Sequence, residues 1–295
     1  MAERSDSGQG AAFAAALKVV LVRVTGRRSA GDDPALGPLV AEARRYVQQF
    51  RVAPDSRLAV AFDGNAVDRW LAQNGQPIWG RERPVTFVWL AVPVTATQAA
   101  GVVRGDDTSA LKAAVDAEAQ LRGIPLRWPT AAELQAHAVD YATVAGGSHA
   151  MLIELGQRLG GEGVLIGRPA GAGATLWLHL FHDRSGNFSG TAEGVDGAAD
   201  VYAGLFAATG APVLVDIEIA GLADVAAYAK VQAYLESLSF VSHVGVRALD
   251  ADRMQLRLSV RGGASALQRA IALNGSLVPQ AATDGVVLHY QLHSR

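Results

Sequence analysis

The spacing of apolar residues in the first third of the chain alternates between the periods of helices and of strands. Residues 11–26 place Phe13, Leu17 and Leu21 on one stripe, which is the spacing of an amphipathic helix that Gly26 would end. Nearly continuous apolar residues over 84–94 instead indicate a buried strand. Helices and strands that alternate in this way are typical of an α/β module. Its other predicted elements are helices over 34–50 and 65–75 and a strand over 57–62.

A stretch of small, polar and glycine residues over 95–109 predicts a linker to a second α/β module. Ser148 is the candidate N-cap of one helix of that module, because a serine before an apolar periodic run is a common helix start. The predicted elements of the module are helices over 109–123, 130–139, 148–161 and 197–210 and strands over 124–129, 163–169, 174–183 and 187–195.

The last part of the chain carries the clearest order of elements. It reads as strand, helix, two strands, helix and strand, which is the order of the ferredoxin-like fold. The predicted elements are strands over 213–219, 241–249, 254–260 and 285–292 and helices over 221–240 and 265–275. The whole chain is therefore expected to be an α/β (α+β) protein with two α/β sandwich modules, residues 1–95 and 108–210, followed by a ferredoxin-like βαββαβ domain, residues 212–295.

The glycine-rich segment VLIGRPAGAGATLWLHLF, residues 164–181, raises the question of a phosphate-binding loop. A Walker A loop needs a lysine after its last glycine, and here Gly173 is followed by Ala174 and Thr175. A dinucleotide fingerprint needs a third glycine where Leu176 stands. The residues from Thr175 onward alternate with a period of two, which is typical of a strand. We therefore predict a hairpin in this segment and no nucleotide cofactor.

The composition excludes several classes of function. The net charge of −2 provides no basic field for a phosphate backbone or for anionic lipid, so we expect no nucleic-acid partner. The chain has no cysteine, which excludes disulfides, thiolate nucleophiles and cysteine-bound zinc. The polar start MAERSDSGQG lacks the apolar core of a secretory signal, and no run approaches the roughly 18 consecutive apolar residues of a spanning helix. We expect no membrane span, and either a cytoplasmic protein or one whose signal peptide has been removed.

Candidate metal-binding and catalytic groups lack the spacing that their chemistry needs. His179 and His182 point to opposite faces of one predicted strand, and we expect them to be solvated residues at the end of that strand. His289 and His293 share a face but lie about 13 Å apart at ~3.3 Å per residue, too far for one metal ion. Asp63 resembles the start of a calcium loop without its later ligands, which favours helix capping. No G-x-S-x-G motif marks a hydrolase serine, so we predict neither catalytic residues nor a metal site.

Two arginine-containing loops are the candidate surfaces for a partner or ligand. In PIWGRERP, Trp79 lies between two prolines beside Arg81 and Arg83, where an indole ring and guanidinium groups can meet a partner. Burial of Trp79 at the edge of the core is the alternative. The second candidate is the glycine-rich loop that holds Arg27 and Arg28, interpreted either as a partner-binding loop or as a solvated one.

The segments AFAAALKVVLVRVTGRR, LAVAFDGNAVDRWLAQNG, VLIGRPAGAGATLWLHLFHD and DVAAYAKVQAYLESLSFV together resemble an uncharacterised proteobacterial envelope family, number 2066 among the domains of unknown function. PIWGRERP followed by WLAV is the most specific part of the resemblance, which covers residues 11–290. The middle segment is also similar to small α/β domains of periplasmic assembly factors, namely the TolB N-terminal domain and the curli secretion lipoprotein. The resemblance implies a periplasmic or envelope location and assigns no catalytic residues.

Three functions follow from these patterns. The leading hypothesis is a non-catalytic periplasmic envelope protein that binds an envelope protein partner during envelope assembly or transport. It is motivated by the absence of a recognisable nucleophile, metal set and phosphate loop, together with the family resemblance. The second hypothesis is a module that binds a glycan or a peptidoglycan fragment near Trp79, Arg81 and Arg83. The third is an enzyme whose acid and base meet only in the folded chain.

Overall fold

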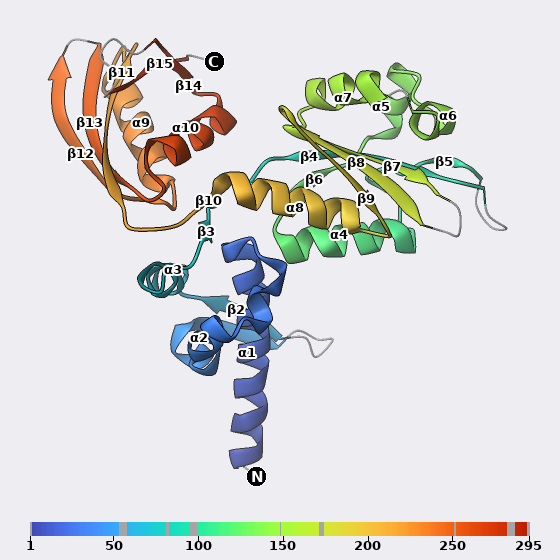
Figure 1. The fold of residues 1–295 in the computed structure, drawn as a ribbon, viewed down its shortest axis with the longest axis horizontal. Coiled ribbons are helices and arrows are strands. Elements are labelled where there is room, and N and C mark those ends of the chain that lie inside the picture. The colour runs from blue at the N-terminus through green and yellow to red at the C-terminus, as the bar shows by residue number, and fades with distance from the viewer. Residues whose placement is uncertain are drawn as a thin grey trace. The chain divides into compact units, whose positions relative to one another are not determined.

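The computed structural model divides the chain into two compact units, each built from helices and strands (Figure 1). The mixture of elements in both confirms the predicted α/β class. One unit combines Met1–Glu82 with Leu205–Arg295, and the other is Arg83–Gly204. The structure describes residues 2–52, 58–80, 83–94, 99–147, 149–170, 174–250, 252–281 and 287–293, without the side chains of 2–7 and 274.

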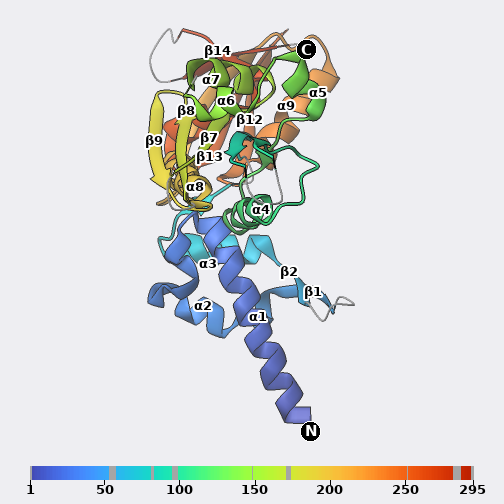
Figure 2. The same cartoon turned by 90° about the vertical axis from the view of Figure 1, so that its right-hand side faces the viewer.

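The N-terminal region of the first unit is built on the long helix α1 (Ala2–Thr25). Phe13, Leu17 and Leu21 are buried on one stripe of α1, as their spacing predicts. The prediction of one helix over 34–50 is wrong over its last four residues, where β1 (Val47–Val52) pairs antiparallel with β2 (Leu58–Phe62) (Figure 2). The remaining elements are η1 (Arg28–Asp32), η2 (Pro34–Leu36), α2 (Gly37–Ala41), η3 (Ala43–Tyr46), α3 (Gly64–Gln73) and β3 (Ile78–Trp79).

Part of α1 is also long and apolar enough to cross a membrane. Gly8–Thr25 meets the length and composition of such a helix, which the count of consecutive apolar residues did not predict. The buried stripe of α1 is what a core helix shows, and an apolar helix near an N-terminus is also what a signal sequence shows. The helix therefore fixes no location for the protein.

The second unit has a mixed sheet with helices on both faces. Its strand order is β5-β4-β7-β8-β9, with β6 also paired to β4; β4 runs parallel to β6 and β7, and the other pairs are antiparallel. In Figure 1, α5, α6 and α7 lie on one side of this sheet and α4 and α8 on the other. The strands are β4 (Thr86–Val92), β5 (Gly101–Val102), β6 (Leu126–Arg127), β7 (Gly163–Pro169), β8 (Thr175–Phe181) and β9 (Arg184–Ser189). The helices are α4 (Ala110–Arg122), α5 (Ala131–Ala136), α6 (Tyr141–Ala145), α7 (His149–Arg158) and α8 (Glu193–Phe206).

Two predictions from the sequence concern the strands of this sheet. Residues 164–181 form a hairpin, because β7 and β8 are antiparallel neighbours and the Ala170 N–H donates to the Ala174 carbonyl oxygen at 2.8 Å. The predicted hairpin is confirmed, although its tip at 171–173 and the candidate N-cap Ser148 lie outside the described residues. The predicted module 1–95 differs from the structure, which places β4 in this sheet and not with the N-terminal region.

The C-terminal region of the first unit has the predicted ferredoxin-like topology. Its sheet has the order β12-β13-β11-β15-β14, with β11 and β15 parallel, as the βαββαβ connection requires. Helices α9 and α10 lie on one side of this sheet (Figure 1), and the buried apolar side chains face them. The elements are β10 (Ala207–Ala208), β11 (Val213–Ala220), α9 (Val225–Ser237), β12 (Val241–Asp250), β13 (Arg253–Val260), α10 (Gly263–Asn274), β14 (Leu277–Pro279) and β15 (Leu288–Leu292).

Candidate functional site

The residues predicted around Trp79 do not form an exposed aromatic surface. Trp79 lies on β3, pairs with Ala207 of β10 and is 2% exposed. Arg81 lies outside the described residues. Arg83 is half-buried, and its guanidinium donates to the backbone carbonyl oxygen of Arg122 at 3.5 Å. The burial of Trp79 agrees with the alternative interpretation, in which this indole is a core residue.

The arginine pair after α1 is split between a structural contact and an exposed position. The Arg27 guanidinium donates to the Gln76 side-chain oxygen at 2.8 Å and lies 2.9 Å from an Asp33 carboxylate oxygen. The pKa of Asp33 is lowered, first by the Ala35 N–H that it accepts and then by Arg27. Arg28 is exposed at the start of η1. Arg27 therefore ties the loop after α1 to the segment after α3, and Arg28 is the more exposed of the two side chains.

A buried polar cluster joins two strands of the second unit, β4 and β8, to α8. Tyr202 of α8 places its hydroxyl oxygen 2.8 Å from Thr86 Oγ1 and 3.0 Å from His179 Nε2. The expectation of a solvated His179 is wrong, because this side chain is fully buried. His182, in the turn after β8, is exposed as expected.

Burial sets the charge states within this cluster. Burial lowers the pKa of His179 to about 4, so its imidazole is neutral at pH 7. Burial also raises the pKa of Tyr202, which keeps the phenol protonated. Neither side chain is accessible to a substrate in this state. The cluster is therefore a hydrogen-bonded part of the core, and it does not supply the hidden acid and base that the enzyme hypothesis requires.

Gly163 of β7 sets the position of the Tyr202 ring, and this contact gives a test of the cluster. A Cβ atom at position 163 would lie 2.0 Å from the Tyr202 hydroxyl oxygen and 3.1 Å from the adjacent ring carbon. We expect Gly163→Ala to displace Tyr202 and to lower the free energy of unfolding by about 1–3 kcal/mol, the cost typical of overpacking. Denaturant unfolding measures the change. Adding Tyr202→Phe to Gly163→Ala removes the clashing oxygen and should recover part of the lost stability. If the double variant is less stable than Gly163→Ala alone, the proposed clash is contradicted.

A second charged cluster ties α4 to α8. The Arg122 side chain is fully buried, and its guanidinium forms ion pairs with Asp196 and with Asp200, the latter at 2.6 Å. The two carboxylates follow each other one helical turn apart on α8, so both reach the same guanidinium. Asp196 and Asp200 are themselves partly in water, at 26% and 65% side-chain exposure. The cluster holds two helices of one layer together, and we assign it a structural role.

The open face of the ferredoxin-like sheet carries a charged hollow of about 220 Å³. Side chains alternate along β11, so Val215 and Ile217 are buried whereas Asp216 and Glu218 face the hollow. This site was not predicted from the sequence, although the alternation in VLVDIEI shows a polar face on this strand. The polar side chains that line the hollow are Asp216, Glu218, Arg247, Gln255, Arg257 and His289.

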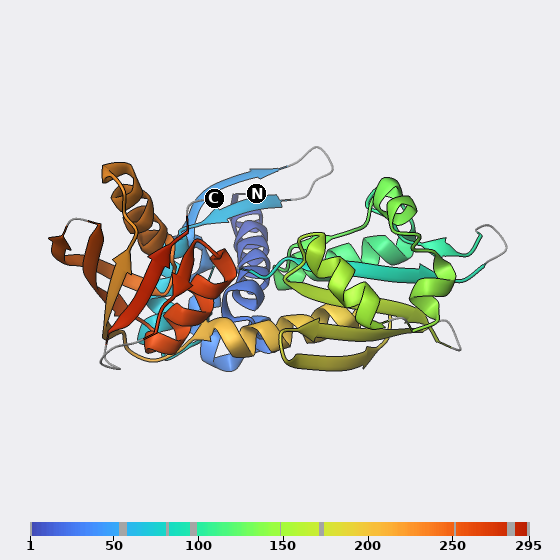
Figure 3. The ribbon, with the colours of Figure 1, turned by 90° about the horizontal axis from the view of Figure 1, so that it is seen from above.

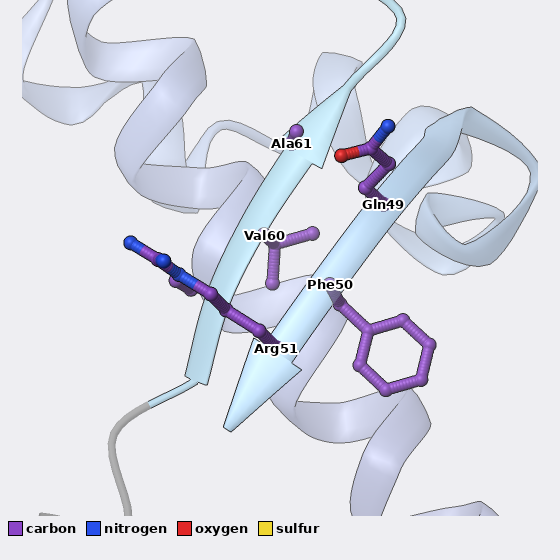
Figure 4. A pocket seen from close by; sticks show the side chains of 6 residues that line it. Gln49, Phe50, Arg51, Val60 and Ala61 are labelled. Atoms are coloured by element: carbon purple, nitrogen blue, oxygen red, sulfur yellow. The ribbon is translucent and has the colours of Figure 1, made fainter. Parts of the chain in front are cut away.

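A second hollow, of about 280 Å³, lies on the two-stranded ribbon formed by β1 and β2 (Figure 4). Figure 4 shows the Arg51 side chain running across β2 and the Phe50 ring pointing away from that strand. Phe50 and Val52 are 49% and 67% exposed. The lining residues are Gln49, Phe50, Arg51, Ala59, Val60 and Ala61.

The predictions about metal and calcium sites can be compared with the geometry. Asp63 caps α3, because its carboxylate accepts the Ala66 N–H at 3.0 Å, which confirms the capping interpretation. Among the described residues, no group of three or more histidine, aspartate or glutamate side chains is arranged to hold a metal ion. His289 lines the hollow of the ferredoxin-like sheet and lies 3.4 Å from a Glu218 carboxylate oxygen.

The comparisons with known proteins identify one domain in the N-terminal region. A family model described as a domain of unknown function (DUF8605) matches residues 1–80. The matched segment covers α1, the ribbon of β1 and β2, α3 and β3, which belong to one unit of the structure. No curated protein matches the chain, and no solved structure matches it.

Proposed function

We propose that this chain is a non-catalytic protein of the cell envelope that binds another protein through the ribbon of β1 and β2, in envelope assembly or transport. The single observation that carries the proposal is the outer strand β1, whose side chains are exposed from Gln48 to Val52. Within the described part of the chain, β2 is the only strand that pairs with β1. One edge of β1 therefore offers its backbone N–H and C=O groups to an added strand.

Among the described residues, β2 supplies most of the contacts between the ribbon and the core. Leu58, Val60 and Phe62 of β2 pack against the core that α1 helps to form, whereas β1 touches it mainly through Val47. The Phe13 and Phe50 rings also meet edge to face, with their centroids 5.2 Å apart. A two-stranded ribbon is marginal without further support, and a third strand would add pairing and cover exposed apolar side chains.

The partner that fits this edge is an extended segment of another protein. Its backbone would pair with β1, and its alternate apolar side chains would contact Phe50 and Val52, which are large and half-exposed or more. An exposed strand edge with apolar side chains is unusual for a protein that acts alone, because such edges favour unwanted association. This argues for a bound partner as the normal state of the ribbon.

Photo-crosslinking from the ribbon tests the proposal. With benzoylphenylalanine in place of Gln49 in living cells, we expect crosslinks to one protein, mapped by mass spectrometry to a single segment of it. Val52→Lys should reduce the yield of crosslinks about fivefold to tenfold, because a lysine on a strand edge opposes pairing. A tenfold loss of affinity corresponds to about 1.4 kcal/mol of binding free energy.

Val94→Lys is the matched control for this experiment. Val94 is 72% exposed, close to the 67% of Val52, and it lies in the other unit of the structure. Equal loss of crosslinks in both variants, or crosslinks scattered over many proteins, would contradict a specific edge on β1.

The envelope location is part of the same proposal and rests on the family resemblance. The likeness of the middle segment to small α/β domains of periplasmic assembly factors supports this location only by analogy. Fractionation of cells that express the native full-length gene tests the location. Recovery with the periplasm or the envelope is expected, and recovery in the cytoplasm alone would remove this part of the proposal.

A further inference from the structure

The hollow on the ferredoxin-like sheet lies on the face that the helices leave uncovered. Its floor is made by paired strands, so opposite residues stand side by side: Asp216 faces Arg257, and Glu218 lies between Gln255 and His289. Figure 3 shows this region from above. No residue of the ribbon lines this hollow, so its role is independent of the partner-binding role proposed for the ribbon.

Both carboxylates of the hollow are already bound by neighbouring side chains. Arg257 donates to the two oxygens of Asp216 at 2.7 and 2.6 Å, a bidentate pair. Glu218 accepts from Gln255 at 3.0 Å and from Arg253 at 3.3 Å. Hydrogen bonding from Arg257 lowers the pKa of Asp216, and hydrogen bonding from Gln255 lowers that of Glu218, so both are ionised at pH 7.

Arg247 also lines the hollow but takes no part in these hydrogen-bonded pairs. It is exposed, and within the described residues no side chain hydrogen-bonds to its guanidinium. Its charge acts on Asp216, but both oxygens of that carboxylate are occupied by Arg257. The hollow is lined by two arginines and two carboxylates, and Arg253 beside it also lies 3.9 Å from an Asp252 carboxylate oxygen. Among the described residues, Arg247 is therefore the lining arginine whose guanidinium has no hydrogen-bonded carboxylate.

An irregularity in the backbone of β12 sets the direction of the Arg247 side chain. The register between β12 and β13 shifts between Val246 and Ala248, so Arg247 is the extra residue of a β-bulge. Bulges redirect side chains and occur often beside functional sites. On the same strand Gly245 stands opposite Arg257, and the His243 imidazole lies 3.4 Å from where a Cβ atom of residue 245 would be.

We propose that this hollow binds a small organic carboxylate, with the Arg247 guanidinium as its main contact. A volume of about 220 Å³ corresponds to roughly seven water molecules at ~30 Å³ each, which suits a molecule of few heavy atoms. The bound carboxylate pairs with the Arg247 guanidinium and receives the two parallel N–H donors that this group offers. A neutral molecule of the same shape gains neither contact.

Nuclear magnetic resonance titration of the full chain tests this site, with N-acetylalanine as the probe. We expect millimolar binding at low salt, with chemical-shift changes confined to backbone amides of β11, β12 and β13 around the hollow. Arg247→Gln should weaken binding at least fivefold. Its exposure and its lack of a side-chain hydrogen bond make loss of folding an unexpected result, which the unchanged remainder of the spectrum verifies.

Two controls make the outcome decisive. Arg158→Gln removes an arginine that is also exposed, at 63%, but lies on α7 in the other unit, and it should leave binding unchanged. The methyl amide of N-acetylalanine lacks the charge and should not bind. Equal binding of the acid and the amide, equal binding by Arg247→Gln, or shifts spread over the whole surface would each overturn the proposal.

Discussion

Replacing both Asp196 and Asp200 by alanine should destabilise the second unit by about 3 kcal/mol, the lower end of the ~3–5 kcal/mol typical of a broken buried ion pair. The reason is the fully buried guanidinium of Arg122, which would lose both carboxylates while remaining charged and out of water. The lower end applies because Asp200 is 65% exposed and its contribution is screened by solvent. Alanine suits the interior of α8, so helix propensity would not add to the loss.

Arg122→Met in the same background separates charge from packing. Methionine fills much of the same space without a charge, so the triple variant should be more stable than the double one, although it has one interaction fewer. Unfolding in guanidinium chloride, followed by tryptophan fluorescence, gives the stability of the native chain and of both variants, because Trp89 and Trp177 are buried in this unit. If the triple variant unfolds more easily than the double variant, the guanidinium does not depend on the two carboxylates and the ion pairs contribute little.

The order of elements was predictable where neighbours in sequence are neighbours in space. The ferredoxin-like region follows from local alternation, because each of its hairpins and crossovers is short. β4 shows where this fails. Its continuous apolar sequence correctly indicated a strand buried on both faces, but its partner β7 comes much later in the chain. No local pattern says which sheet such a strand joins, and the predicted module boundary at 95 therefore differs from the structure.

The strand β1 was mistaken for a helix because two periods fit the same residues. Leu39, Ala43 and Val47 have helical spacing, but Ala43 and Val47 belong to different elements. The segment from Val47 onward is short, β-branched at both ends and aromatic at Phe50, and pairing with β2 decides its conformation. Tertiary pairing overrode a weak local preference, so β1 could not be predicted, whereas its partner β2 was.

The burial of single side chains in the candidate sites could not be predicted from the sequence either. On β8 the sequence suggested two faces, one of leucines and one with Trp177 and His179, without saying which is covered more completely. The structure buries Trp177 and His179 fully, and Leu176 is 40% exposed. Helices cover both faces of this sheet, so hydrophobic alternation no longer separates inside from outside. The role of Arg247 depends on a register shift, which alternation cannot reveal.

Acid should destabilise the second unit through His179, and this is the second large effect that the structure predicts. The pKa of His179 is lowered to about 4 by burial, against 6.5 in an unfolded chain. The unfolded state therefore takes up a proton at higher pH than the folded state. The stability linked to this side chain is present above pH 6.5, is lost as the pH falls towards 4, and is fully lost below 4. At 1.36 kcal/mol per pH unit the full loss is about 3 kcal/mol, of which about 2 kcal/mol falls between pH 7 and pH 5.

Comparison with His179→Gln isolates this effect, since glutamine does not titrate and can still hydrogen-bond to Tyr202. Glu162 acts in the opposite direction, because burial raises its pKa and its protonation at low pH favours the fold. Both proteins carry Glu162, so subtracting their unfolding free energies at pH 7 and pH 5 removes its contribution. We expect His179→Gln to be less stable than the native chain at pH 7 and to lose about 2 kcal/mol less on going to pH 5. Parallel stability curves for the two proteins would mean that His179 is solvated and protonates freely in the folded chain, which its hydrogen bond to Tyr202 and its complete burial argue against.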